Sequence, residues 1–150
     1  MKPIKNPFMN QPGYNCFGCA PHNPWGLHLE CALDEETGDV VAKWTPHENF
    51  QSWVNTLHGG IQATLLDEIC CWVICEKYHC AAVTSRLEMK YIQPVSTVDG
   101  DLFLRARDVE VRRQFVTVTA ELLDSHGEIR TKCKTVYRLF TAQQAPPDNA

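Results

Sequence analysis

The sequence predicts an α+β domain in which one curved antiparallel sheet wraps around a single long helix. The chain has 150 residues, enough for one domain with a full core. Residues 61–77 contain no glycine or proline and are rich in leucine, isoleucine, alanine and cysteine, which predicts a mostly buried helix. The segments on either side alternate apolar and polar residues, as half-buried strands do. A helix this apolar cannot lie on a surface, so we expect the strands to cover it.

The remaining elements follow in order along the chain. Residues 1–26 hold five of the nine prolines and predict an irregular arm. The domain itself is expected over residues 27–140, and the tail 141–150 is expected to be disordered. Strands are predicted at 27–33 and 40–44 before a loop at 45–57, and at about 83–91, 102–111, 116–122 and 128–140 after the helix.

Composition excludes several classes of protein. The net charge is −4, whereas a nucleic-acid-binding protein has a basic excess. No segment has the length and apolarity of a membrane span, and the first residues lack the apolar core of a signal peptide. Eight cysteines without a secretion signal indicate reduced thiols, which predicts a cytoplasmic protein.

The start of the helix is the segment richest in possible chemistry. Gly59 and Gly60 allow close approach to the backbone, and the first N–H groups of a helix have no internal partner, so a developing oxyanion could bind there. The same glycines could simply form a tight turn. Asp67 and Glu68 interrupt the apolar helix. A buried carboxylate needs a partner, a shifted pKa or a function. One of the two could be a solvated residue, and Glu68 fits that description better.

The sequence LHGGIQATLLDE, with His58 nine residues before Asp67, resembles the helix motif of hotdog-fold acyl-CoA thioesterases of the phenylacetate-degradation type. The later segments YIQPV and DGDL follow in the order of that family, and the resemblance covers residues 27–140. It implies the hotdog fold, and a site at a dimer interface to which different chains supply the acid and the glycine. The expected assembly is a homodimer or a dimer of dimers.

The resemblance also implies roles for individual residues. Asp67 matches the nucleophile or general base, and Gly60 matches the residue whose N–H polarises the thioester carbonyl. His58 matches the histidine that shapes the loop, and Thr84 matches a hydroxyl residue that holds the water or the carboxylate. Relatives often carry asparagine six residues before the histidine. This chain has Ser52 there and Asn55 three residues before His58, so the supporting arrangement departs from the pattern.

Coenzyme A is anionic, so a chain of negative net charge needs local basic groups to hold it. We expect Arg112 and Arg113, near a strand end, to contribute, together with Gly59 and Glu68 at the substrate site. A further basic row on the last strand could equally be the solvated outer face of the sheet; it comprises Arg130, Lys132, Lys134 and Arg138.

The arm contains a Cys-x-x-Cys motif, Cys16 and Cys19, followed by Asn23-Pro24-Trp25-Gly26-Leu27. It resembles the N-terminal stretch of one branch of these thioesterases and is expected to pack over the sheet or near the ligand channel. Cys16, Cys19 and His22 could bind zinc if His28 or Cys31 came near. We nevertheless predict no metal-binding residue for the functional site.

The sequence therefore predicts a thioester hydrolase that converts an acyl-CoA to free acid and CoA, with no cofactor apart from the CoA of its substrate. Two alternatives stay open: a hotdog module that binds acyl-CoA without turning it over, and a hotdog dehydratase or hydratase. The acid after His-Gly-Gly favours the enzyme over the binding module, and the dehydratase motif is not seen.

Overall fold

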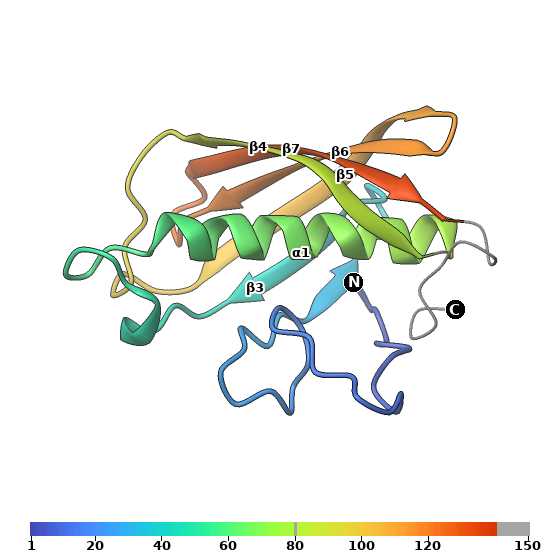
Figure 1. Ribbon diagram of the computed structural model, residues 1–150. Coiled ribbons are helices and arrows are strands. Elements are labelled where there is room, and N and C mark those ends of the chain that lie inside the picture. The colour runs from blue at the N-terminus through green and yellow to red at the C-terminus, as the bar shows by residue number, and fades with distance from the viewer. Residues whose placement is uncertain (80, 141–150) are drawn as a thin grey trace.

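A computed structural model describes residues 1–79 and 81–140. The strands within these residues form one antiparallel sheet in the order β1-β2-β3-β5-β6-β7-β4, with the helix α1 (Gly59–Tyr78) against one face (Figure 1). The strands are β1 (Lys2–Pro3), β2 (Cys31–Leu33), β3 (Val40–Trp44), β4 (Ala82–Tyr91), β5 (Leu102–Arg112), β6 (Phe115–Leu123) and β7 (Ile129–Leu139). This confirms the predicted fold class of a curved sheet around one helix. In the part of the chain that the structure describes, no helix could cross a membrane.

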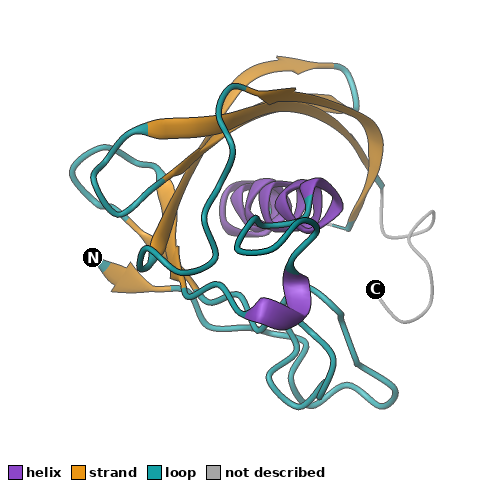
Figure 2. Ribbon diagram, turned by 90° about the vertical axis from the view of Figure 1, so that its left-hand side faces the viewer, coloured by secondary structure: helices purple, strands orange, loops and turns teal. Residues whose placement is uncertain are grey.

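The helix α1 lies in the concavity of the sheet, and Figure 2 shows the sheet curving around it. Its apolar side chains are buried over most of its length, so burial rather than amphipathic patterning holds it in place. The facing strands supply the other half of the core. In β6, the buried Val116, Val118, Ala120 and Leu122 alternate with partly exposed residues, as the sequence predicted.

The helix begins and ends close to the predicted limits of 61 and 77. The Nδ1 atom of His58 accepts the N–H of Gly60 at 2.8 Å, which caps the first turn two residues earlier than predicted. The loop before the helix contains a short 3₁₀ helix, η1 (Glu48–Phe50). The buried Gln62 fixes this loop to the sheet: its Nε2 donates to the Leu57 carbonyl, and its Oε1 accepts from Thr131.

The prediction for residues 27–33 is only partly correct. Leu27, Leu29 and Cys31 are buried in alternation, but ladder pairing is confined to β2. The N–H groups of Leu27 and Leu29 instead donate to the carbonyls of Phe17 and Gly18. The arm therefore takes the place of a neighbouring strand here. The arm was predicted to be irregular throughout, yet its first residues form β1, which pairs with β2. The predicted disordered tail lies outside the described residues.

Candidate functional site

Asp67 lies in the middle of α1, half-buried, with two hydroxyl groups on one of its carboxylate oxygens. Thr84 Oγ1 donates to Asp67 Oδ1 at 3.0 Å, and the Tyr137 hydroxyl lies 2.6 Å from the same oxygen. Tyr137 also lies 2.6 Å from the Asp67 backbone carbonyl, so its one proton is shared between two acceptors. Asp67 Oδ2 has no hydrogen-bond partner within the described residues. The carboxylate is thus oriented through one oxygen and open at the other.

Tyr137 is almost completely buried, at 1% exposure, on the inner face of β7. Burial, followed by the nearby Cys70 thiol and the Asp67 carboxylate, raises the pKa of Tyr137 far above its usual range. Tyr137 therefore stays a proton donor at every physiological pH. Sequence reasoning missed this residue, because a tyrosine in an alternating strand has the same pattern as any other core aromatic residue.

Thr84 reaches Asp67 because β4 contains an irregularity. Thr84 pairs with Tyr137 across the sheet, but the next paired residue in β4 is Arg86, so Ser85 is the extra residue of a bulge. Simple alternation would place Ser85, not Thr84, on the same face as Leu87 and Tyr91. The bulge reverses this and turns the threonine toward α1. The hydroxyl predicted for the site therefore bonds to Asp67, and both Thr84 and Ser85 are exposed in the single chain.

At the N-terminus of α1, the two glycines differ in what their N–H groups contact. The Gly60 N–H is taken by the His58 ring. The Gly59 N–H has no partner among the residues described, and the Gly59 carbonyl accepts from the Tyr91 hydroxyl at 2.7 Å. The N–H of Gly59 is therefore the one open to a ligand, whereas the sequence favoured the N–H of Gly60 for this role. Because His58 Nδ1 is the acceptor, a neutral His58 carries its proton on Nε2.

The open donor and the open carboxylate are far apart within one chain. Gly59 and Asp67 are separated by eight residues of helix, or about 12 Å along the helix axis. A single thioester carbonyl cannot contact both. The fold of one chain therefore presents two halves of a possible site without joining them.

The other predicted support residues lie in the loop before the helix. Ser52 is exposed, and its N–H and Oγ both contact the Thr56 carbonyl, at 2.8 Å and 3.5 Å. Asn55 adopts a left-handed backbone with φ of 61° and lines a small pocket with the segment from Pro94 to Leu102. Neither side chain forms a described contact with Asp67.

Arg112 and Arg113 lie at the turn between β5 and β6, where they line a shallow pocket with Phe115. Neither forms an ion pair in the described part of the chain, so both charges are available to an anionic ligand. On β7, Lys132, Lys134 and Arg138 are exposed on the outer face of the sheet, away from α1. Arg130 is engaged by Asp124 and Glu128.

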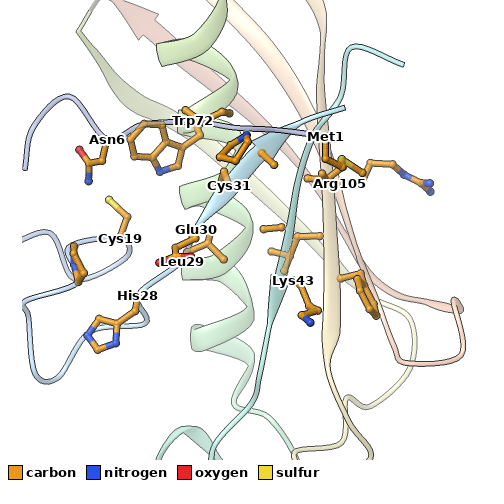
Figure 3. A pocket seen from close by; sticks show the side chains of 18 of the residues that line it. Met1, Asn6, Cys19, His28, Leu29, Glu30, Cys31, Lys43, Trp72 and Arg105 are labelled. Carbon is orange, nitrogen blue, oxygen red and sulfur yellow. The ribbon is translucent and has the colours of Figure 1, made fainter. Parts of the chain in front are cut away.

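Glu68 does not face the same region as Asp67. Its carboxylate lies against the arm, where Cys16 Sγ donates to Glu68 Oε1 at 3.6 Å. It is not the solvated residue that the sequence suggested. A pocket of about 750 Å³ opens beside this part of the arm, and Asp67 is not among its lining residues. Figure 3 shows residues that line it, with Cys19 from the arm, His28 just after the arm, and Lys43 and Arg105 from β3 and β5.

One long helix enclosed by an antiparallel sheet, with a carboxylate held by hydroxyls at mid-helix, is the hotdog architecture found in thioesterases. The chain belongs to the thioesterase superfamily, whose family profile matches residues 54–131. That stretch includes the helix and its His-Gly-Gly motif.

Solved structures agree in fold. A thioesterase superfamily protein superposes with a TM-score of 0.74 at 20% identity over 82% of this chain, which spans 62% of that protein's length. A phenylacetic acid degradation-related protein of Ralstonia eutropha JMP134 gives 0.69 at 20% identity, covering 81% of this chain and 92% of the other. A Bacillus halodurans protein solved with CoA gives 0.68 at 23% identity, covering 77% and 76%. None of the curated proteins matches the chain.

Proposed function

We propose that this protein is an acyl-CoA thioesterase that hydrolyses a thioester to a free acid and CoA, with Asp67 as nucleophile or general base. The observation that carries the proposal is the carboxylate geometry: Oδ1 is held by Thr84 and Tyr137, and Oδ2 is free. Thioesterase superfamily membership and the CoA in the Bacillus halodurans structure support the substrate class. Because the chain resembles phenylacetate-degradation thioesterases, aromatic acyl-CoAs are the substrates to test first.

The reaction needs little from the protein beyond position and charge. As a general base, Asp67 Oδ2 takes a proton from water while the water oxygen attacks the thioester carbon. The carbon–sulfur bond then breaks, and the proton passes to the departing CoA thiolate. As a nucleophile, Oδ2 attacks the carbon directly, and the carbon–sulfur bond breaks to release the CoA thiolate. Water then hydrolyses the resulting anhydride, which restores the Asp67 carboxylate, frees the acid and supplies the proton that the thiolate takes up. Thr84 and Tyr137 hold the carboxylate in the same orientation for either route.

The negative charge that develops on the thioester oxygen needs a donor, and Gly59 is the best placed. Its N–H is unpaired among the described residues and stands at the positive end of the α1 dipole. His58 contributes by capping the helix through Gly60, and Tyr91 by binding the Gly59 carbonyl. Ser52 and Asn55 support this loop. Gly60 is thereby assigned to the cap rather than to the oxyanion.

Because Gly59 and Asp67 of one chain cannot meet at one carbonyl, we assign the complete site to a homodimer, alone or as part of a dimer of dimers. The strand β4 ends the sheet order, so one of its edges makes no ladder with described residues. It is ten residues long and exposes Val83, Leu87 and Tyr91. A long edge strand that exposes apolar side chains favours pairing with another strand. Arg112 and Arg113 are the candidates for the CoA phosphates.

The proposal is tested by thiol release from a panel of short, long and aromatic acyl-CoAs. Wild type is expected to release thiol, and Asp67→Asn to lose at least about 100-fold in kcat, the usual cost of losing one essential catalytic group. Glu76→Gln makes the same charge change on the same helix and is expected to keep wild-type activity. Full activity in Asp67→Asn would overturn the assignment.

The open alternatives give different outcomes in the same experiment. A binding module would bind acyl-CoA tightly as wild type and as Asp67→Asn and release no thiol from either. A dehydratase or hydratase would leave the thioester intact and change the acyl chain, which mass spectrometry of the recovered acyl-CoA detects.

A further inference from the structure

Three potential metal ligands from two distant segments converge beneath the arm. Cys16 and Cys19 lie in the arm and Glu68 lies in α1, and one ligand atom from each lies within 4.8 Å of the other two. The Cys16 sulfur and a Glu68 oxygen are 3.6 Å apart. In a tetrahedral zinc site with ordinary Zn–S and Zn–O bonds, a sulfur and an oxygen are also separated by about 3.6 Å. The spacing of Cys16 and Glu68 therefore matches that of two ligands of one zinc ion.

The surroundings of Glu68 are acidic rather than basic. Within residues 1–79 and 81–140, no lysine, arginine or histidine pairs with this carboxylate. Its neighbours are the thiols of the arm and the adjacent Asp67. A half-buried carboxylate with no basic partner is costly unless it is protonated or neutralised by a cation.

Both thiols would bind the ion as thiolates, because thiolate, not thiol, is the form that binds metal. Metal binding therefore releases the thiol protons. Cys19 also borders the pocket of Figure 3, which gives an ion a route to the cluster.

The arm is shaped to hold this arrangement. The turn from Cys16 is closed by the Ala20 N–H on the Cys16 carbonyl, and the Gly18 carbonyl is fixed by the Leu29 N–H. A side chain at Gly18 would place its Cβ 2.5 Å from the Glu68 carboxyl carbon, so only glycine permits the contact. The two cysteines therefore approach Glu68 along a backbone of fixed course.

We propose that Cys16, Cys19 and Glu68 bind a zinc ion that ties the arm to α1. Two thiolates and a carboxylate are zinc ligands, and three protein ligands leave one coordination position for water. The histidine expected as a ligand from the sequence is not in the set. His22 and His28 bond instead to the backbone carbonyls of Tyr14 and Asn23. The site is independent of the hydrolytic activity proposed for Asp67.

The test uses cobalt(II) as a spectroscopic substitute for zinc on the full-length, reduced, metal-stripped protein. Wild type is expected to bind one cobalt per chain, with thiolate-to-cobalt charge-transfer absorption and the visible bands of a tetrahedral ion. Zinc is expected to displace the cobalt. Cys16→Ser and Cys19→Ser are expected to remove or strongly reduce the charge-transfer band. Cys71→Ser, a thiol on the same helix outside the ligand set, is expected to leave it unchanged.

Glu68→Gln tests the carboxylate ligand independently of the two thiols and keeps the side-chain volume. It is expected to shift the visible bands and to weaken cobalt binding at least about tenfold, while circular dichroism stays native. No charge-transfer absorption in wild type would overturn the proposal. So would an unchanged spectrum and affinity in Glu68→Gln, or equal absorption in wild type and the double variant Cys16→Ser, Cys19→Ser. None of these readouts depends on thioesterase activity.

Discussion

At position 67, two hydroxyl groups reach the same carboxylate oxygen from two neighbouring strands. Thr84 comes from β4 and Tyr137 from β7, and the two residues pair directly across the sheet. The strand pairing therefore sets the direction of both donors, and the helix only has to bring Asp67 over them. A charged acceptor strengthens such bonds, to about 1.5–3 kcal/mol each. The reactive oxygen is oriented by the sheet rather than by the loop.

Replacing Tyr137 by phenylalanine tests this orientation. We expect Tyr137→Phe to lower kcat about tenfold or more, because Asp67 keeps only the Thr84 bond, while KM changes little since no substrate contact is removed. Steady-state kinetics on the best acyl-CoA measures the split. Tyr78→Phe removes a tyrosine hydrogen bond to Asp108, away from the site, and is the matched control. An unchanged kcat in Tyr137→Phe would show that Thr84 alone suffices.

The sequence predicts part of this site and misses part of it, for physical reasons. A carboxylate in an apolar helix and two glycines at its start are exceptions to local rules, so Asp67 and the His58 region stand out. Tyr137 fits the alternation of a buried strand, so nothing in the sequence marks it as a residue of the site. The choice between Gly59 and Gly60 depends on which N–H the His58 ring occupies, and that requires coordinates.

Among the elements, β4 shows the limits of pattern reading most clearly. Its alternation from residue 83 onward looks regular, yet a bulge at Ser85 changes the phase and decides which hydroxyl faces α1. The helix was easier to predict, because its length and apolarity are properties of the whole segment. Its C-terminal end is fastened by side chains: Lys77 and Tyr78 both bond to Asp108 of β5.

This fastening predicts a pH-dependent contribution to stability. Burial alone would raise the pKa of Asp108, but the bonds from Lys77 and Tyr78 outweigh it and lower that pKa. A carboxyl whose pKa is lower folded than unfolded stabilises the protein above the unfolded value of about 4, and the benefit is lost as pH falls through the folded value. Asp108→Asn is expected to cost about 1 kcal/mol at pH 7.

Urea unfolding at pH 7 and near pH 3 measures the effect. The difference between wild type and Asp108→Asn should shrink at the lower pH, because pH 3 lies below the pKa of Asp108 in the unfolded chain, which then takes up a proton there. Asp99→Asn removes an exposed carboxylate that forms no ion pair with the described residues, and it serves as the control. A stability difference that stays the same at both pH values would contradict the expected role of the Asp108 charge.

At the scale of the whole molecule, the arm and the helix are joined by contacts between residues distant in sequence. Cys16 and Glu68 are 52 positions apart, and no periodicity connects them. The sequence could therefore identify the cysteine pair and the acid separately, but not their contact. The same holds for the sheet edge: the sequence of β4 resembles that of any other strand, and only the strand order shows that, among the described residues, it is terminal and unpaired on one side.

Each chain carries two halves of a site that it cannot join by itself. Two inactive variants, each lacking a different half, are therefore predicted to restore activity in a mixed dimer. Gly59→Pro removes the N–H proposed to bind the oxyanion. Proline is well tolerated at the first helical position, and His58 already has a ψ of 134°, which suits the residue before proline. Asp67→Asn removes the other half. In a mixed dimer, one site carries both defects and the other carries neither.

We therefore expect Gly59→Pro and Asp67→Asn to be nearly inactive alone and to recover activity when they are unfolded together and refolded as a mixture. Random pairing would restore about a quarter of wild-type activity, since half of the dimers are mixed and each has one intact site. Gly59→Ala keeps the N–H, so mixing it with Asp67→Asn controls for changes at position 59 that do not involve that donor. A mixture no more active than its components would contradict the assignment of the Gly59 N–H and the Asp67 carboxylate of different chains to one site.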